Sequence, residues 1–279
     1  MRRYRIVHTT VMDYDQAVRA SHNEVRMSPL NEPGQSTLEN RIRIRPITWS
    51  HVYRDHWGTH VTAMESLAPH QRLEIEATST VERTSQPEPP ATAGWDALHD
   101  PGLVDRSSEW LMDSTRTRPG EGLIALAESV RDAPSPREAA AWLAETIRTT
   151  MTYERGATGV AARGEEAWAL GNGVCQDFAH IAIGALRYLD IPARYVSGYL
   201  DPSAESNVGD VSEGESHAWV EYWDNAWLPL DPTNVGAVGL AYVVVARGRD
   251  YEDVPPFKGV YSGRGVAEPE VTVRFTRLA

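Results

Sequence analysis

The chain has 279 residues, of which 41% are hydrophobic and 24% charged, a composition typical of a folded globular protein rather than a disordered one. Its formal net charge of -12 argues against nucleic acid or an anionic membrane surface as the main partner. The single cysteine excludes an intramolecular disulfide, a cysteine-based zinc site and an iron–sulfur cluster.

The sequence also bears on the compartment. The N-terminus carries two arginines but no apolar segment behind them, and no stretch of the chain reaches the length of a membrane span. A lone cysteine fits a reducing compartment. We therefore expect a cytoplasmic protein that does not bind a membrane.

Residues 1–85 have the pattern of β-strands. The runs 5–10, 40–47 and 73–83 are rich in β-forming residues, and the last two alternate polar with apolar positions. Turn signals such as the Asn-Glu-Pro-Gly run at 31–34 separate them. Short alternating strands at this spacing predict a β-sandwich-like N-terminal domain.

A change of pattern follows at residues 86–100. This stretch begins with QPEPPATAG, whose prolines cannot keep the hydrogen bonds of a helix or a central strand. It predicts a linker to a second domain at 101–279. That domain opens with helical signals: Ser135 and Glu138 have the spacing of a helix N-terminal cap, and apolar residues then recur every three or four positions.

A second predicted helix begins beside the only cysteine. From Val174 the sequence runs VCQDFAHIAIGALRYLD with a wide apolar face, and Pro192 ends the pattern. Gly-Asn-Gly comes directly before it, so Cys175 lies at or near the helix N-terminus. Strand signals return later in the chain, at 194–200, 218–223, 242–246 and 271–275. A helix followed by an antiparallel sheet predicts an α+β fold.

The position of Cys175 favours nucleophilic chemistry. A thiol ordinarily titrates near pH 8.5 and attacks carbonyl groups as the thiolate. The unpaired N–H groups and positive dipole end of a helix N-terminus stabilise a thiolate, and the same N–H groups can receive an oxyanion. From helix position alone, a buried cysteine with a purely structural role is an equally good interpretation.

A histidine and an aspartate later in the chain complete a candidate triad. His217 lies at the start of the alternating run SHAWVEYW. Asp231 follows fourteen residues later, directly after the run AWLPL. If these are adjacent antiparallel strands, Asp231 returns beside His217. Its carboxylate can then hold one imidazole nitrogen while the other faces Cys175. A strand histidine and an Asp-Pro turn are each ordinary features, so the prediction depends on the three residues together.

These segments resemble a known family. GVCQDFAHIAIGALRYLDIPARYVSGYL, SHAWVEYW and LPLDPTN resemble, in that order, the Cys, His and Asp blocks of the transglutaminase-like superfamily. GRDYEDVPPFKGVYSG resembles the C-terminal signature of its bacterial branch, and YRIVHTT and DHWGTHV resemble the β-rich domain that precedes the core there. One departure is Trp57-Gly58-Thr59, where the family commonly has an FGN-like turn. That turn lies outside the catalytic blocks.

The resemblance implies a role for each triad residue. Cys175 would be the nucleophile, His217 the general base and acid, and Asp231 the group that orients His217. It also implies a papain-like α+β core, with the cysteine helix packed on an antiparallel sheet. The implied substrate is an amide of a peptide or protein, attacked to give an acyl-thioester without a cofactor.

Four neighbouring residues are weaker candidates. Trp168 could line the site of the acyl group or donate its indole N–H to an oxyanion, although core packing is the preferred interpretation. Gln176 could donate its side-chain amide in the same role or point to solvent. Asp177 suits the first turn of a helix whatever its chemistry. His180 falls a turn and a half beyond the cysteine, and we expect it to be structural.

No metal or nucleotide cofactor is expected. His51, His56 and His60, with Asp55 between them, raise the question of a metal site, but they lack an HExxH pattern and histidines near turns are common. GNGVCQ has no third glycine and no βαβ context for a dinucleotide.

The triad by itself leaves the reaction open. Water as acceptor gives peptidase or amidase activity, which we expect because no export signal is visible. An amine acceptor gives a protein-glutamine transglutaminase. A non-catalytic binding module is a third interpretation, disfavoured because all three triad residues are present. The acidic run 201–215, which lacks an EF-hand pattern, is predicted to be a mobile loop and a lid on the site.

Overall fold

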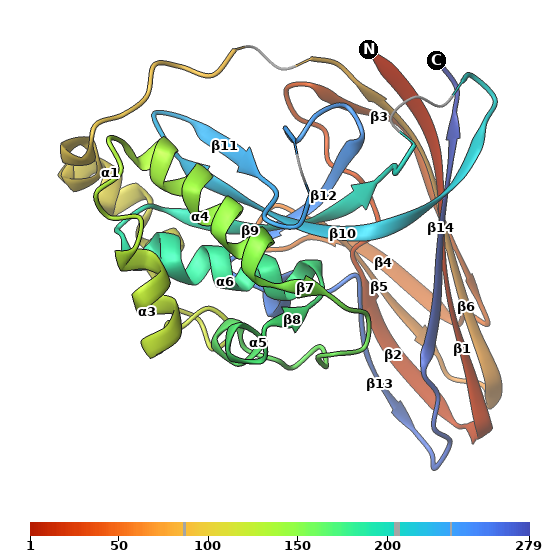
Figure 1. The fold of residues 1–279 in the computed structure, drawn as a ribbon. Helices are drawn as coiled ribbons and strands as arrows, with labels where there is room; N and C mark the ends of the chain where they lie inside the picture. The colour runs from red at the N-terminus through yellow and green to blue at the C-terminus, as the bar shows by residue number, and fades with distance from the viewer. Residues whose placement is uncertain (86–87, 204–206, 235) are drawn as a thin grey trace.

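One curled antiparallel sheet joins the two ends of the chain. The computed structural model describes residues 1–85, 88–203, 207–234 and 236–279. In these residues the main sheet has the order β12-β9-β10-β14-β1-β6-β3, with β11 paired to β10 (Figure 1). Its strands are β1 (Arg2–Val18), β3 (Gln35–Arg45), β6 (His70–Arg83), β9 (Ala193–Leu200), β10 (Val211–Trp223), β11 (Trp227–Leu230), β12 (Tyr242–Gly248) and β14 (Pro269–Arg277).

A smaller antiparallel sheet covers part of the N-terminal strands. Its order is β13-β2-β5-β4. An apolar cluster lies between the two sheets, with members from β1, β3 and β6 on one side and from β2 and β5 on the other. The strands are β2 (Ala20–Val25), β4 (Trp49–Arg54), β5 (His60–Ser66) and β13 (Phe257–Ser262). This arrangement buries the alternate positions that the sequence pattern marked as apolar.

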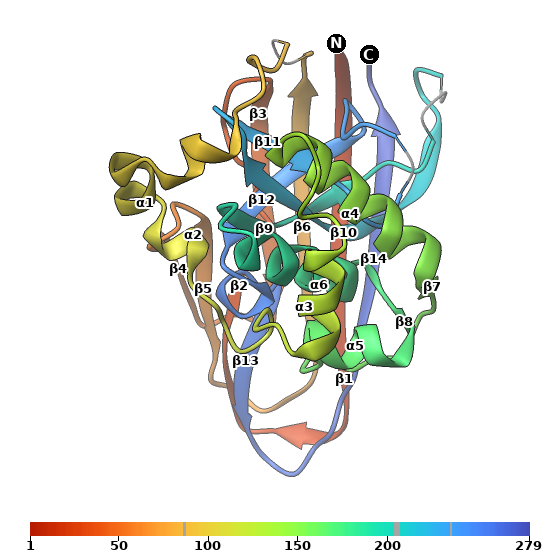
Figure 2. The same cartoon turned by 60° about the vertical axis from the view of Figure 1, so that its left-hand side comes forward.

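The helices gather at the other end of the molecule and pack on β9 and β10 (Figures 1 and 2). They are η1 (Trp95–His99), α1 (Pro101–Arg106), α2 (Ser108–Leu111), α3 (Glu121–Glu128), α4 (Pro136–Thr150), α5 (Gly164–Leu170), α6 (Cys175–Tyr188) and η2 (Tyr251–Asp253). A short parallel pair, β7 (Thr152–Tyr153) and β8 (Asn172–Gly173), leads into α6. Among the described residues no helix is long and apolar enough to cross a membrane.

Helix α6 is the centre of the helical layer. It packs against α3, α4, α5, β9 and β10, and its apolar side chains are fully buried in the largest core cluster. Ser135 caps α4 as expected, because its hydroxyl accepts the N–H of Glu138. A cysteine helix packed on an antiparallel sheet confirms the predicted α+β fold.

The regions separated at 86–100 in the sequence share secondary structure. Strand β14, from the end of the chain, lies between β10 and β1, and β13 pairs with β2. The sequence analysis assigned the strand signal at 271–275 to the second domain, because the sequence pattern of a strand does not show which strand it pairs with. Parts of the stretch 86–100 are also anchored: the N–H of Ala93 donates to the carboxylate of Asp224. Residues 86–87 lie outside the described part.

The predicted lid at 201–215 differs from the structure at its C-terminal end. Residues 211–215 are not a loop, because β10 already begins at Val211 and pairs there with Thr276 of β14. Gly214 accommodates this pairing, since a Cβ at that position would lie 2.4 Å from the ring of Phe275. Residues 204–206, within the expected lid, lie outside the described residues.

Candidate active site

Cys175 is the first residue of α6, as the sequence predicted. Helix α5 ends at Gly171, whose φ of 73° is a left-handed conformation that favours glycine. The chain then passes through β8 and enters α6 at Val174. This connection places the sulfur next to the unpaired N–H groups of the first helical turn.

Asp177 fixes the start of this helix. One of its carboxylate oxygens accepts the N–H of Val174 at 2.9 Å and the hydroxyl of Thr158 at 2.5 Å. Asp177 is fully buried, so these hydrogen bonds secure both the helix start and the loop that carries Thr158. A Cβ on Gly173 would lie 2.7 Å from the same carboxylate oxygen. The glycine before the cysteine therefore makes room for the cap.

His217 and Asp231 meet as the strand argument predicted. Strand β10 carries His217, and β11 pairs antiparallel with it so that Asp231, just beyond its end, returns to the histidine. His217 Nε2 lies 2.7 Å from Asp231 Oδ2, and both side chains are buried. His217 also lies close enough to Cys175 for that residue to raise the pKa of the imidazole. The structure thus brings all three predicted triad residues together.

Asp231 is itself held by groups that the sequence analysis did not select. Its Oδ2 accepts the hydroxyl of Tyr242 at 2.8 Å and the amide of Asn234 at 2.9 Å. Its Oδ1 accepts the backbone N–H groups of Thr233, at 2.8 Å, and Asn234. The Pro-Thr-Asn run after Asp231 was visible as a turn, but the role of Tyr242 depends on the position of β12, which no local pattern reveals.

The charges of the three groups support one another. Burial by itself lowers the pKa of His217, but its hydrogen bonds to Asp231 and Cys175 and their negative charges outweigh burial and raise that pKa to about 9. Burial acts to raise the pKa of Asp231, yet the hydrogen bonds from His217, Asn234 and Thr233 prevail and lower it. At neutral pH the favoured state of this pair is therefore an imidazolium bound to a carboxylate.

Cys175 is partly exposed, and an open cleft lies on one side of the site. Tyr153 lines this cleft, and its pKa is raised by burial and further by the charge of Cys175, which places the phenol beside the sulfur. Ser216, next to His217 in the chain, also lines this cleft. The cleft has a volume of about 720 Å³ and polar walls that include an ion pair between Arg155 and Glu215.

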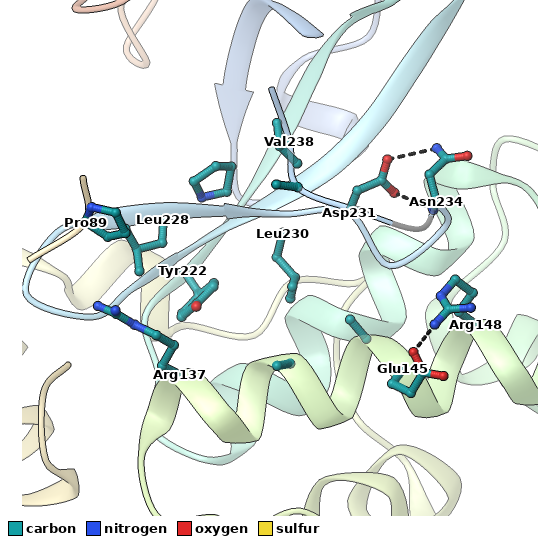
Figure 3. A pocket seen from close by; sticks show the side chains of 15 residues that line it. Pro89, Arg137, Glu145, Arg148, Tyr222, Leu228, Leu230, Asp231, Asn234 and Val238 are labelled. Atoms are coloured by element: carbon teal, nitrogen blue, oxygen red, sulfur yellow. Dashed lines mark hydrogen bonds and ion pairs between the residues drawn. The ribbon is translucent and has the colours of Figure 1, made fainter. Parts of the chain in front are cut away.

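A second cavity reaches Asp231 from the side of α4. Figure 3 shows Leu228 and Leu230 of β11 above this helix, with the Asp231–Asn234 pair at one end of the cavity and the Glu145–Arg148 ion pair on the helix below. Its volume is about 570 Å³. The triad carboxylate is therefore close to an apolar-walled space as well as to the histidine.

Comparison with known proteins identifies the family. Residues 124–232 match the Transglutaminase-like superfamily, and residues 4–82 match the bacterial transglutaminase-like N-terminal region. An uncharacterized protein of Mycobacterium leprae is 40% identical over 100% of both chains. The chain belongs to the transglutaminase-like superfamily.

Further relatives differ in how much of the chain they cover. An uncharacterized protein of Mycobacterium tuberculosis is 34% identical, covering 92% of this chain and 87% of its own. A protein-glutamine gamma-glutamyltransferase of Pseudomonas aeruginosa is 41% identical over 68 residues, which are 22% of this chain and 10% of that one. A solved structure from Cytophaga hutchinsonii, described as a candidate cysteine protease, has a TM-score of 0.75 at 20% identity, covering 98% and 90%. This last likeness shows the shared fold.

Within this transglutaminase-like core, the two weaker candidates have other neighbours. The side-chain amide of Gln176 donates to the carbonyl of Val160 at 3.2 Å, which ties the loop before α5 to the cysteine helix. Trp168 packs against Gly122 of α3, where a Cβ would lie 2.8 Å from the indole. These contacts favour positioning for Gln176 and core packing for Trp168.

Three other candidates from the sequence, Asp55, His56 and His180, have local partners. His56 pairs with Glu109 at 2.9 Å, and Asp55 pairs with Arg26 while accepting the N–H groups of its own turn. His180 is fully buried and accepts the N–H of Tyr251. Among the described residues no group of three or more metal-ligating side chains converges.

Proposed function

We propose that this chain is a cysteine-dependent amidase or peptidase that acts on peptide or protein amides through an acyl-thioester. The observation that carries the proposal is the position of His217, which is hydrogen-bonded to Asp231 at 2.7 Å and lies close enough to Cys175 for that residue to raise the pKa of the imidazole. A protonated imidazole beside a thiolate is the starting state of cysteine acyl transfer.

The residues divide the reaction between them. The thiolate of Cys175 attacks the amide carbon, forming a C–S bond and an oxyanion close to the first N–H groups of α6. His217 gives its proton to the amide nitrogen, the C–N bond breaks and an amine leaves. His217, now neutral, takes a proton from water, whose oxygen attacks the thioester. The C–S bond breaks, which releases a carboxylic acid and restores the Cys175 thiolate beside the charged His217. Asp231 holds His217 in position throughout.

Two features favour water as the acceptor and a chain-like substrate. The cleft beside Tyr153 has polar walls, among them Arg155, Glu215 and Ser216, which suit water as the acceptor. A cleft beside Tyr153 and a cavity at Asp231 also give an extended peptide two places to lie. An accessible peptide in the cytoplasm is accordingly the substrate we propose.

A second candidate is transfer to an amine, as in a protein-glutamine transglutaminase. The 68-residue similarity to a protein-glutamine gamma-glutamyltransferase favours it. The two reactions share every step up to the thioester, and the acceptor alone distinguishes them.

Product analysis separates the two. A library of blocked, glutamine-containing peptides is incubated with the enzyme, with and without a fluorescent primary amine, and the products are measured by mass spectrometry. We expect hydrolysed products in both samples and none from Cys175→Ala. Incorporation of the amine in place of hydrolysis would support transferase activity instead.

If neither product forms, His217→Ala incubated with the same library tests for a trapped thioester. Its absence would favour a non-catalytic role.

A further inference from the structure

Behind the candidate active site, the sheet carries a separate, partly open cavity. It lies on the side of β9, β10 and β12 where Trp219, Val196 and Val244 form a core of their own, distinct from the core around α6. The cavity has a volume of about 370 Å³, within the range that holds a small organic molecule. It is lined by Glu32, Pro33, Arg83, Arg194, Trp219, Glu221, Trp227, Pro229, Val238, Tyr242, Val244 and Arg247.

The charged groups in its wall do not balance. Glu221 is bound by Arg194 at 2.5 Å and by Arg247 at 2.8 Å. Glu32 is bound by Arg247 at 2.6 Å. Two carboxylates are therefore shared between two guanidinium groups. The third guanidinium, Arg83, forms no ion pair among the described residues, so the wall carries one surplus positive charge although the whole chain has a net charge of -12.

Arg83 is an unusual residue to leave unpaired. Its side chain is only 4% exposed, its one hydrogen bond goes to the carbonyl of Gly34, and its Nε has no acceptor. Burial lowers its pKa despite the nearby charge of Glu32. A buried cation without a counter-charge is costly, so an anion in the cavity would relieve a strain that is built into the fold.

A second donor at the same cavity also lacks an acceptor. The indole N–H of Trp219, a fully buried residue, meets no oxygen among the described residues. Its ring stacks on His217 with centroids 6.1 Å apart and packs edge-on against Tyr242. Trp227, Pro229 and Val238 supply an apolar surface beside these donors. The cavity thus combines a surplus positive charge with apolar walls.

We propose that this cavity binds a carboxylate whose short apolar body lies against the two indoles and whose charge is compensated by Arg83. The carboxylate belongs either to a free small acid or to the C-terminus of a peptide. Trp219 and Tyr242, which line the cavity, also contact His217 and Asp231 of the candidate active site. The proposal does not depend on which reaction that site performs.

Binding of defined probes to the full chain tests the site. Isothermal titration calorimetry with benzoate, and with N-acetyl-dialanine as a peptide C-terminus, is compared with their neutral amides. We expect saturable binding of at least one acid, and binding of its amide weaker by about 10-fold or more, since a hydrogen bond to a charged group is lost. No saturable binding of either acid, or equal binding of acid and amide, would overturn the proposal. The acid that binds more tightly identifies the source of the carboxylate.

Variants locate the binding to this cavity. Arg83→Gln removes the charge and is expected to weaken acid binding by about 10-fold or more. The matched control is Arg3→Gln, which removes a half-exposed arginine paired with Glu82 at the surface and is expected to leave affinity unchanged. Equal affinity of the Arg83 variant and the native protein would contradict the proposal. If Arg83→Gln does not fold, Trp219→Phe replaces the indole with a smaller ring that has no N–H, and unchanged affinity in that variant would likewise contradict the proposal.

Discussion

At the scale of single residues, His217 is the group on which the account depends. Asp231 is held by four donors besides His217, and this fixed carboxylate in turn fixes the imidazole. The raised pKa of His217 has a direct consequence for the pH dependence of catalysis. A leaving amine needs a proton, and His217 can supply it only in its charged form.

The pH profile of kcat/KM therefore has a predictable alkaline side. Because the pKa of His217 is raised to about 9, the imidazolium persists at neutral pH, and kcat/KM is expected to fall as the pH rises through about 9. Asp231→Asn removes the negative charge that supports this state. In that variant the alkaline fall is expected at lower pH, with kcat/KM at pH 7 reduced by about 10²-fold or more. An unshifted alkaline limb in the variant would argue against the role of Asp231.

The triad residues could be predicted from the sequence, but the groups that hold them in place could not. Cys175, His217 and Asp231 lie in motifs that can be recognised locally, as can the turn after Asp231. Tyr242 was placed only in a strand pattern, because its hydroxyl reaches Asp231 through the position of β12. Arg83 resembled the other arginines of an alternating strand, and its lack of a counter-charge became visible only in three dimensions.

At the scale of elements, the strands behind the site are packed with little free space. Gly198 of β9 lies beside Trp219, the residue that stacks on His217. A Cβ there would lie 2.1 Å from the carbonyl oxygen of Val243 and 2.6 Å from the indole. A backbone oxygen in a sheet has no alternative position to move to, so even one methyl group must displace β9 or β12.

Gly198→Ala is therefore expected to lower the free energy of unfolding by about 1–3 kcal/mol, the usual range for overpacking. Gly94→Ala is the control, since a Cβ there meets nothing within 4 Å, and a change within about 0.5 kcal/mol is expected. Urea denaturation measures both. Equal free energies of unfolding for the two variants would contradict this prediction, because they would show that the sheet accommodates a methyl group at Gly198.

The elements themselves were predictable to different degrees. Helices α4 and α6 have caps and apolar stripes that mark their boundaries in the sequence, and the structure places them there. Strand β10 was expected from residue 218 but begins at Val211. Its first part is acidic and contains a glycine, and it becomes a strand only because β14 lies alongside.

At the scale of the whole molecule, the shared sheet makes the two sequence regions interdependent. Strand β1 is paired on both sides, with β6 from its own region and with β14 from the end of the chain. Removing either region would expose long sheet edges and the apolar cluster between the two sheets. The sequence predicted a β-rich region and a mixed one, but the pairing between them depends on contacts across the whole chain.

Calorimetry tests this interdependence. We expect the full chain to unfold in a single transition, and a fragment of residues 1–85 to lack a cooperative transition because it loses β13 and β14. The reciprocal fragment, 88–279, provides the comparison and is expected to behave the same way. Two separate transitions in the full chain, or a cooperatively folded fragment 1–85, would show that the regions are independent.

The reactivity of Cys175 tests the central claim, a thiolate held next to a charged His217, most directly. The measurement is the rate of alkylation by iodoacetamide at pH 7 in the native protein and in His217→Ala, beside N-acetylcysteine as a free thiol. We predict a native rate about 10-fold or more above that of the free thiol, and loss of this advantage in the variant. A native rate no higher than that of the free thiol, and equal in the variant, would contradict the account.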